Sequence, residues 1–478
     1  MIILGTNSIK DTGYDVANSC RFNGGSSDSL NRTLGTPTNN KKYTISTWVK
    51  KTKNSGNVNG NAQSLMGTIG GDDTYFEFNG STDQLFFGEY SSSAWQIEIK
   101  TNRVLRDVSA WYHIVLAVDT TQGTESNRVK LYINGVQETS LAQTNYPSQN
   151  FNTKLNSASN HYISNNGNIG GAYAAYLEGY LSEYCLIDGT ALDPTSFGEF
   201  DEDSGIWKPI DVSGLTFGTN GFYLDFEDSS ALGNDAAGSN NFTVNNLTAI
   251  DQSTDTCTNN FATLNPLDRA NGTTAIVSDG NLTLAHSGGT NGSHTMLKST
   301  LAVSKGKWYS EYKQTVNGGT NRFGIIDIAQ INYPTSTNPY VGSFSGGYAY
   351  QSDGNKENNN VDSSYGNSYS SGDIIGVAFD SDNGNIWFSK NGTWQNSATI
   401  SEIEAGTTTN AAFTGIDTSK NYGFASSPYN NGAGTHNFGS PSFAISSGNT
   451  DGNGYGNFEY AVPSGYYSLN TKNLAEYG

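Results

Sequence analysis

The stretch GDIIGVAFDSDNGNIWFSKNGTW, residues 372–394, decides the fold class of this chain. Its apolar run IIGVAFD ends at the turn Asp382-Asn383-Gly384, and the alternating run NIWFSK ends at Asn391-Gly392. Asn-Gly pairs favour tight hairpin turns because both central residues tolerate positive φ. Residues 111–137 repeat this plan, with HIVLAVD, RVKLYI and then Asn134-Gly135. The sequence therefore predicts antiparallel hairpins in both halves of the chain.

Composition supports a β-rich protein with two domains. The chain has 478 residues, of which 35% are hydrophobic and 12% aromatic, and it contains 56 glycines. Gly, Asn and Ser favour turns, and the sequence has no sustained helical periodicity. Short strands with frequent turn signals are typical of sandwiches, and the length fits two of them. We therefore expect an all-β protein of two antiparallel β-sandwiches.

Charge and hydropathy exclude several classes of function. The net charge is −19, and an acidic surface repels phosphate backbones, so we expect no nucleic-acid partner. No apolar run is long enough to cross a bilayer, so we expect no membrane insertion. The opening MIILGTNSIKD has too short an apolar core for a signal peptide. Cys20, Cys185 and Cys257 are too few and too far apart for a disulfide framework, which predicts buried free thiols.

Three segments of the first half are similar to a known family. YTISTWVKKTK (43–53), AWYHIVLAVDTTQGTESNRVKLYINGVQ (110–137) and LEGYLSEYCLIDGTALDPTSFGE (177–199) resemble laminin-G or pentraxin-like domains. These domains belong to the concanavalin A-like lectin/glucanase superfamily of jelly rolls. The resemblance implies a jelly-roll sandwich over residues 17–230.

Four segments of the second half resemble the SPRY domain, another jelly-roll sandwich. They are GKWYSEYK (306–313), GGYAYQSDGNKENNN (346–360), YSSGDIIGVAFDSDNGNIWFSKNGTW (369–394) and HNFGSPSF (436–443). The expected organisation is an N-terminal docking arm (1–16), the first jelly roll (17–230), an ordered connector (231–265) and the SPRY-like jelly roll (266–478). The arm is expected because MIILGTNSIKD reads as an apolar strand that would pair with a partner's sheet edge.

The pairing of the two domains, with phrases such as FGEFDEDSGIWKPI and TNNFATLNPLD, resembles virion structural proteins of marine tailed bacteriophages. The resemblance implies a protein assembled in the host cytoplasm and exposed on the virion surface. Its partners would be other virion proteins, and it would form a homo-oligomer, a trimer by analogy with phage fibres. The favoured function is a tail-fibre or appendage adhesin that binds host-surface glycan or protein. A capsid decoration, head-fibre or cement protein without a specific receptor is the alternative.

Glycan hydrolysis is the enzymatic alternative, since the superfamily includes glucanases. Their retaining members carry E-x-D-x-x-E on one strand, where alternation puts the carboxylates on the same face. The nearest match, Glu199-Phe200-Asp201-Glu202-Asp203-Ser204, has Ser204 in place of the last Glu and reads as a turn. His113 reads as a satisfied strand histidine, and no nucleophile elbow or phosphate loop occurs. We therefore expect that the protein is not an enzyme.

Calcium is the one cofactor that stays open. Some laminin-G and pentraxin-like domains bind Ca²⁺ through loop oxygens, which suit a hard cation. Turns rich in Asp and Asn also occur without any ion, because their side chains bond their own backbone. The candidate ligands are Asp72, Asp73, Asp225, Glu227, Asp228, Asp235, Asp380 and Asp382.

Two loops of the second half are the expected contact surface, because SPRY domains bind through loops at one end of the sandwich. INYPTSTNPYVGSFSGGYAYQSDG and SSPYNNGAGTHNFG mix aromatics with Asn, Ser and Gly, a composition that suits sugar or protein surfaces. The alternative is that these tyrosines only cap the sandwich. The candidate ligand-binding residues are Tyr333, Tyr340, Tyr350, Tyr429, Asn430 and Asn431.

Overall fold

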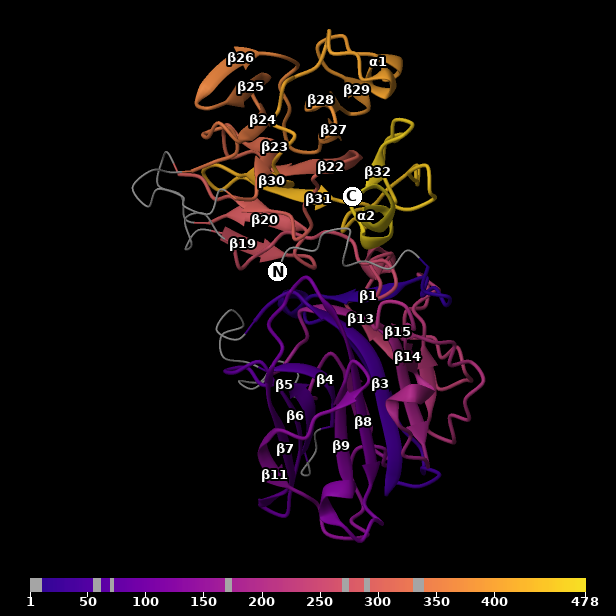
Figure 1. The fold of residues 1–478 in the computed structure, drawn as a ribbon. Helices are drawn as coiled ribbons and strands as arrows, with labels where there is room; N and C mark the ends of the chain where they lie inside the picture. The colour runs from indigo at the N-terminus through magenta and orange to yellow at the C-terminus, as the bar shows by residue number, and fades with distance from the viewer. Residues whose placement is uncertain are drawn as a thin grey trace. The chain divides into compact units, whose positions relative to one another are not determined.

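The computed structural model describes residues 11–54, 62–68, 73–167, 174–268, 275–287, 293–329 and 339–478. The chain forms two compact units, with Thr12–Thr258 in one and Asn259–Gly478 in the other. Each unit is built from antiparallel sheets, and Figure 1 shows both. The expected all-β class is confirmed. Among the described residues, α-helix is confined to α1 (Ile400–Ala405) and α2 (Thr471–Tyr477), and neither is long enough to span a membrane.

Sheet 1 of the first unit has the order β10-β9-β8-β3-β13-β1-β18, with β16 beside β13. Its strands are β1 (Ser19–Phe22), β3 (Lys42–Lys51), β8 (Trp111–Asp119), β9 (Val129–Ile133), β10 (Val136–Gln137), β13 (Gly179–Asp188), β16 (Phe222–Leu224) and β18 (Gln252–Ser253). The expected hairpin turn joins β9 to β10, where Asn134 has φ 48° and Gly135 has φ 78°.

Sheet 2 lies against sheet 1 and has the order β11-β7-β6-β5-β4-β12-β2-β17. Its strands are β2 (Ser29–Thr33), β4 (Gln63–Thr68), β5 (Asp73–Phe78), β6 (Gln84–Ser91), β7 (Ala94–Val104), β11 (Leu141–Asn145), β12 (Asn160–Ile163) and β17 (Thr243–Asn245). Alternate residues of both sheets point inward and form one apolar core, to which Leu116 and Leu131 contribute from sheet 1 and Phe76 and Phe87 from sheet 2.

The chain segment that follows β13 runs back over sheet 1 and covers part of its outer face; we call it the covering segment. It carries β14 (Gly198–Phe200) and β15 (Trp207–Pro209), which pair with each other, and it packs a second apolar cluster against that face. The cluster includes Val115 and Cys185, which alternate with the core residues of β8 and β13. The 3₁₀ turns of this unit are η2 (Gly24–Ser26), η3 (Glu125–Asn127), η4 (Pro194–Ser196) and η5 (Ala249–Asp251).

Of the stretch 231–265, expected as an ordered connector, residues 231–258 contribute structure to the first unit and residues 259–265 belong to the second. Strands β17 and β18 of this stretch pair with β2 and β1. Asp255 is almost fully buried, and its carboxylate accepts from Lys50 Nζ at 2.7 Å and from Trp111 Nε1 at 3.1 Å. Both bonds tie the chain around Asp255 to the first sandwich. Breaking the ion pair would be costly, because it would leave an uncompensated buried charge.

The second unit repeats the two-sheet plan. Sheet 3 has the order β19-β20-β31-β22-β27-β28-β29, with β32 parallel to β22, and sheet 4 has the order β21-β30-β23-β24-β25-β26. The strands of sheet 3 are β19 (Ala275–Ser278), β20 (Thr283–His286), β22 (Lys307–Val316), β27 (Ile374–Asp380), β28 (Asn385–Lys390), β29 (Thr393–Trp394), β31 (Ala433–Asn437) and β32 (Tyr467–Ser468). Those of sheet 4 are β21 (Leu297–Lys298), β23 (Arg322–Asp327), β24 (Gly347–Gln351), β25 (Asn355–Asn358), β26 (Val361–Ser364) and β30 (Tyr422–Ser427).

Individual residues determine the hairpin turns and the helix cap of the second unit. The stretch 372–394 forms β27, β28 and β29, and Asn391 and Gly392 make the second turn with φ 47° and 76°. Helix α1 begins with a capping box, in which Thr399 Oγ1 accepts from the backbone N–H of Glu402 while the Glu402 carboxylate accepts from that of Thr399. The pairings of β27 with β28 and of β28 with β29 confirm the two hairpins expected within residues 372–394.

Candidate functional site

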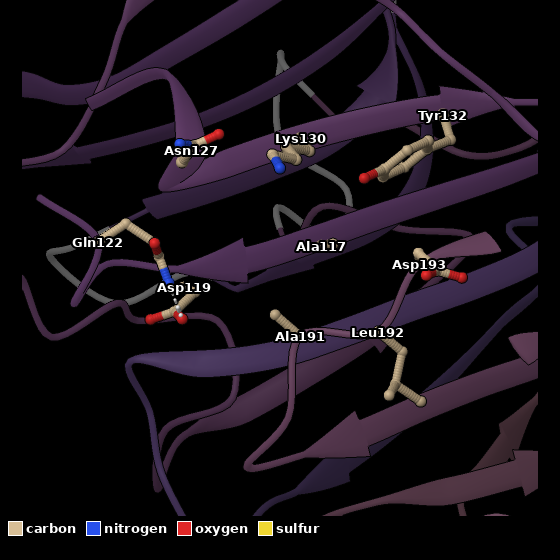
Figure 2. A pocket seen from close by; sticks show the side chains of 9 residues that line it. All are labelled: Ala117, Asp119, Gln122, Asn127, Lys130, Tyr132, Ala191, Leu192 and Asp193. Carbon is tan, nitrogen blue, oxygen red and sulfur yellow. Dashed lines mark hydrogen bonds between the residues drawn. The ribbon is translucent and has the colours of Figure 1, made fainter. Parts of the chain in front are cut away.

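A pocket of about 310 Å³ lies on the outer face of sheet 1, where the covering segment leaves that face open. Figure 2 shows its walls: Lys130 and Tyr132 project from β9, and Ala191 and Leu192 come from the loop that precedes η4. Ala117 of β8 forms the floor. These strand residues point outward because their neighbours on β8 and β9 point into the core. The volume suits one small polar molecule such as a hexose.

Carboxylates stand at two sides of the pocket. Asp119, at the end of β8, accepts from Thr121 Oγ1 at 2.6 Å and from Gln122 Nε2 at 2.7 Å, and it pairs with Lys42 Nζ at 3.3 Å. Burial raises the pKa of Asp119, but these bonds outweigh it and hold the pKa below its usual value. Asp193 caps η4 by accepting from the backbone N–H of Thr195 at 2.9 Å. Both carboxylates are therefore fixed acceptors.

Donors and an apolar surface complete the pocket. Lys130 supplies an ammonium group, and the side chains of Gln122 and Asn127 supply amides. Burial, together with the charge of Asp193, raises the pKa of the Tyr132 phenol, which therefore stays a neutral donor at physiological pH. An aromatic ring beside Leu192 and two alanines, with acceptors and donors around them, can hold the apolar face and the hydroxyls of a sugar together.

The structure brings two of the predicted tyrosines together in the second unit. Tyr340 and Tyr429 each lie against the His294 ring, with ring centroids 4.6 Å apart in both cases. The Arg322 guanidinium carbon lies 3.9 Å from the Tyr340 ring centroid, and Arg322 Nε donates to Glu357 Oε2 at 2.6 Å. Burial, with the charge of Arg322, lowers the pKa of His294 to about 3, so this imidazole is neutral. Both tyrosine rings are only half-buried.

The remaining predicted residues have other surroundings. Tyr350 is fully buried in the core between sheets 3 and 4, where its ring packs against Phe388 and its hydroxyl donates to the Asn367 carbonyl. Its expected place at a contact surface is therefore corrected: alternation along β24 turns its ring inward. Asn430 and Asn431 form the turn between β30 and β31 with φ 42° and 64°. Tyr333 lies outside the described residues.

His113 is a buried structural residue, as its strand position indicated. Its Nε2 lies 2.8 Å from Ser46 Oγ, and Trp207 Nε1 donates to its Nδ1 at 3.0 Å. Burial lowers its pKa to about 3. The ring also stacks between Trp48 and Trp207, with centroid distances of 4.9 and 5.9 Å. The histidine thus joins β8 to the covering segment of sheet 1.

The acidic stretch 199–204 is a hairpin and turn. Glu199 and Phe200 belong to β14, and the chain then turns at Asp201, whose carboxylate accepts from Ser204. Lys208 Nζ lies 3.4 Å from Glu199 and 3.3 Å from Asp201, so one ammonium bridges both carboxylates. The arrangement is a charge cluster around Lys208, in which Glu199 is exposed and Asp201 and Lys208 are mostly covered.

The carboxylates considered for Ca²⁺ bond nearby groups of the protein. Asp235 accepts from the backbone N–H groups of Tyr223, Ala237 and Asn240. The others bond turns or neighbouring strands: Asp73 accepts from Tyr75, Asp225 from Glu227, Asp228 from Ser230, Asp380 from Asn383, and Asp382 from Gly306. Within the described residues, no group of three or more His, Cys, Asp or Glu side chains could hold a metal ion. Asp72 lies outside the described residues, and the backbone N–H of Glu227 donates to Asp225 at 3.1 Å.

Sequence reasoning missed the pocket because its walls come from separate parts of the chain. Asp119 and Lys130 lie within the hairpin 111–137, whose alternation was recognised, but Ala191 to Asp193 join them only through the return of the chain over sheet 1. Outward polar residues at alternate positions of β9 were the available signal. The loop that contains Ala191, Leu192 and Asp193 carried no such signal.

Comparison with known proteins identifies two domains. The family model of the concanavalin A-like lectin/glucanases superfamily matches residues 23–193, and that of the SPRY domain matches residues 307–439. Among solved structures, the SPRY domain of human HERC1 matches at 18% identity and a TM-score of 0.27, over 36% of this chain and 96% of that one. No curated protein matches the chain. The chain carries a concanavalin A-like domain followed by a SPRY domain.

Proposed function

We propose that this protein is a recognition protein whose concanavalin A-like domain binds a hexose of a surface glycan in the pocket on sheet 1. The observation that carries the proposal is the pocket itself, which combines a Tyr132 ring with fixed acceptors and an ammonium donor. Sugar hydroxyls need both donors and acceptors, and the ring gives the apolar face of the sugar a partner. The lectin-like class of the surrounding domain agrees with this use.

Saturation-transfer NMR with free hexoses and N-acetylhexosamines tests the pocket. We expect transfer from the full-length protein to at least one sugar, and its loss in Lys130→Ala and Tyr132→Ala, which remove the ammonium and the ring. Lys305→Ala is the matched control, because Lys305 is an exposed lysine of the second unit. Absence of transfer to every sugar, or equal transfer from the wild type and both pocket variants, would contradict the proposal.

We further propose that the protein acts on a virion surface, as a tail fibre or appendage that attaches the particle to its host, in trimers and in contact with other virion proteins. The support is the resemblance of the paired domains to virion structural proteins, together with two modules of binding type in one chain. In this setting the host ligand would be a surface glycan or receptor. We expect no catalytic turnover of that ligand.

Gold-labelled antibody on intact particles tests the location. Label at the tail or its appendages would support attachment to the host. Label spread over the capsid would instead favour a decoration or cement role, and particles lacking the protein would then lose stability rather than infectivity. Particles that carry no label would contradict a virion role altogether.

A further inference from the structure

A β-bulge places an exposed tryptophan on the outer face of sheet 2, which is the opposite side of the sandwich from the pocket. The pairing of β6 with β7 shifts register between Glu89 and Tyr90, so that Tyr90 faces Trp95 across the strands. A bulge inserts one extra residue and thereby re-aims the side chains beyond it. Ile97 and Ile99 still point into the core, whereas Trp95 stands outside with 38% of its surface exposed.

Three further aromatic rings pack around Trp95. Tyr75, Phe86 and Tyr90 have ring centroids 5.8, 5.7 and 5.4 Å from that of Trp95. Tyr90 is also 38% exposed, and Phe86 is 8% exposed. The two phenol hydroxyls add polar edges to this group of rings, which we call the Trp95 platform (Tyr75, Phe86, Tyr90 and Trp95).

A glycine makes room for the platform. A Cβ atom on Gly88, between Phe86 and Tyr90 on β6, would lie 2.4 Å from Phe86 Cζ and 2.8 Å from Trp95 Cζ3. Only glycine therefore lets both rings lie against the strand. Covering a strand glycine with an aromatic ring has structural value by itself, but that purpose does not call for a second exposed ring at Tyr90.

Polar groups adjoin the rings on the same face. Glu77 pairs in register with Phe86, and Glu98 pairs with Gly88. Glu77 is 8% exposed, and its Oε2 is a buried oxygen with no hydrogen-bond partner among the described residues. Burial raises its pKa to about 8, so the group is a neutral carboxylic acid at pH 7. The Glu77 side chain therefore adds no charge to this face at pH 7.

The ligand class follows from the rings and the charges. Flat aromatic surface beside scattered donors and acceptors suits a pyranose chain, whose rings have an apolar face and a hydroxylated edge. Asp73 and Glu98 are the acidic residues that add to the charge of this face, Lys100 lies on the same face, and the whole chain carries −19. An anionic polysaccharide would be repelled by this surface.

We propose that the Trp95 platform is a second glycan-binding site, which takes an extended, uncharged polysaccharide along the outer face of sheet 2. The sugar rings stack on Trp95 and Tyr90. Their hydroxyls bond the Tyr75 phenol and the Glu98 carboxyl group. The site is independent of the pocket on sheet 1, which takes a single hexose unit.

Native gel electrophoresis of the full-length protein through dissolved polysaccharide tests the site. The neutral probes are dextran, laminarin, mannan and galactomannan, and alginate is the anionic probe. We expect at least one neutral probe to retard the wild type, and alginate not to. Trp95→Ala should weaken the binding constant by about thirtyfold, the loss typical of a central tryptophan contact. Tyr90→Ala, which removes an exposed ring with little effect on the fold, should also weaken it.

Two controls separate this site from other causes. Phe200→Ala removes another half-exposed aromatic ring of the same sandwich and should leave the retardation unchanged. The double variant Lys130→Ala/Tyr132→Ala removes the pocket and should also leave retardation by the long polymer in place. The proposal is overturned if no neutral probe retards the wild type, if only alginate does, or if both platform variants bind as the wild type does. Retention lost only in the pocket variant would overturn the platform and leave the pocket standing.

Discussion

At the scale of the residue, two buried titratable groups of the first sandwich are neutral because of burial. Burial raises the pKa of Glu77 to about 8 and lowers the pKa of His113 to about 3. His113 has partners on both ring nitrogens, whereas Glu77 has a buried oxygen without a hydrogen-bond partner in the described part of the chain. Substitutions at the two residues should therefore change the free energy of unfolding in different ways.

Glu77→Gln should remove a pH dependence of stability. At low pH the folded and unfolded chains both hold the Glu77 proton. As the pH rises from 4.5 toward 8 the unfolded chain loses it while the folded chain keeps it, so the wild type loses roughly 1.4 kcal/mol of this contribution per pH unit. Between pH 5 and pH 8, we expect the free energy of unfolding of the variant, measured in urea, to rise relative to that of the wild type. Parallel curves for the two proteins over that window would contradict the raised pKa.

His113→Ala should destabilise the first unit by about 3 kcal/mol or more. The change leaves Trp207 Nε1 and Ser46 Oγ without their buried partner and opens a cavity between stacked rings. Urea unfolding followed by tryptophan fluorescence measures the loss. A loss below about 1 kcal/mol would mean that the histidine is not the join between β8 and the covering segment.

At the scale of the element, hairpins were predictable and side-chain direction was not. Asn134-Gly135 and Asn391-Gly392 predict turns because their backbone needs positive φ, and both turns form. The segment GYAYQ has the same alternation whichever face is buried, and only the neighbouring strands turn Tyr350 inward. The bulge beside Tyr90 depends likewise on the β6–β7 register. The sequence contains local turn geometry, whereas the site residues depend on pairings between distant strands.

Gly392→Ala should destabilise the second unit more than Gly372→Ala. Both glycines have positive φ, 76° and 95°, so both substitutions strain the backbone by roughly 1–2 kcal/mol. A Cβ on Gly392 would also lie 2.6 Å from Tyr460 Cδ1, whereas one on Gly372 would meet no atom of the described residues within 4 Å. Thermal unfolding of the two variants measures the difference. Equal losses would show that the ring moves away at no cost.

At the scale of the whole molecule, each unit has its own two-sheet core. Sheets 1 and 2 enclose one apolar cluster, and sheets 3 and 4 enclose another. The all-β class and the two domain types were predictable from the sequence because they depend on strand patterns and turns. The role of residues 231–258 was harder to predict, since their short strands carry little apolar alternation and Asp255 pairs with a lysine far away in sequence.

Fragments of the first unit test this role. Residues 12–258 should fold alone and unfold cooperatively. Residues 17–230 lack β17, β18 and Asp255, which leaves the Lys50 ammonium buried without its partner. We expect this shorter fragment to be less stable by 3 kcal/mol or more, about the cost of breaking a buried ion pair. Equal stability of the two fragments in urea would place residues 231–258 outside the folding unit.

The most direct test of glycan recognition is binding of the full-length protein to an array of neutral, amino-sugar and uronic-acid glycans at pH 7. We predict binding to uncharged hexose glycans, and its loss in the combined variant Lys130→Ala/Tyr132→Ala/Trp95→Ala while the melting temperature is retained. A folded wild-type protein that binds no glycan, or a combined variant that binds as the wild type does, would contradict the claim.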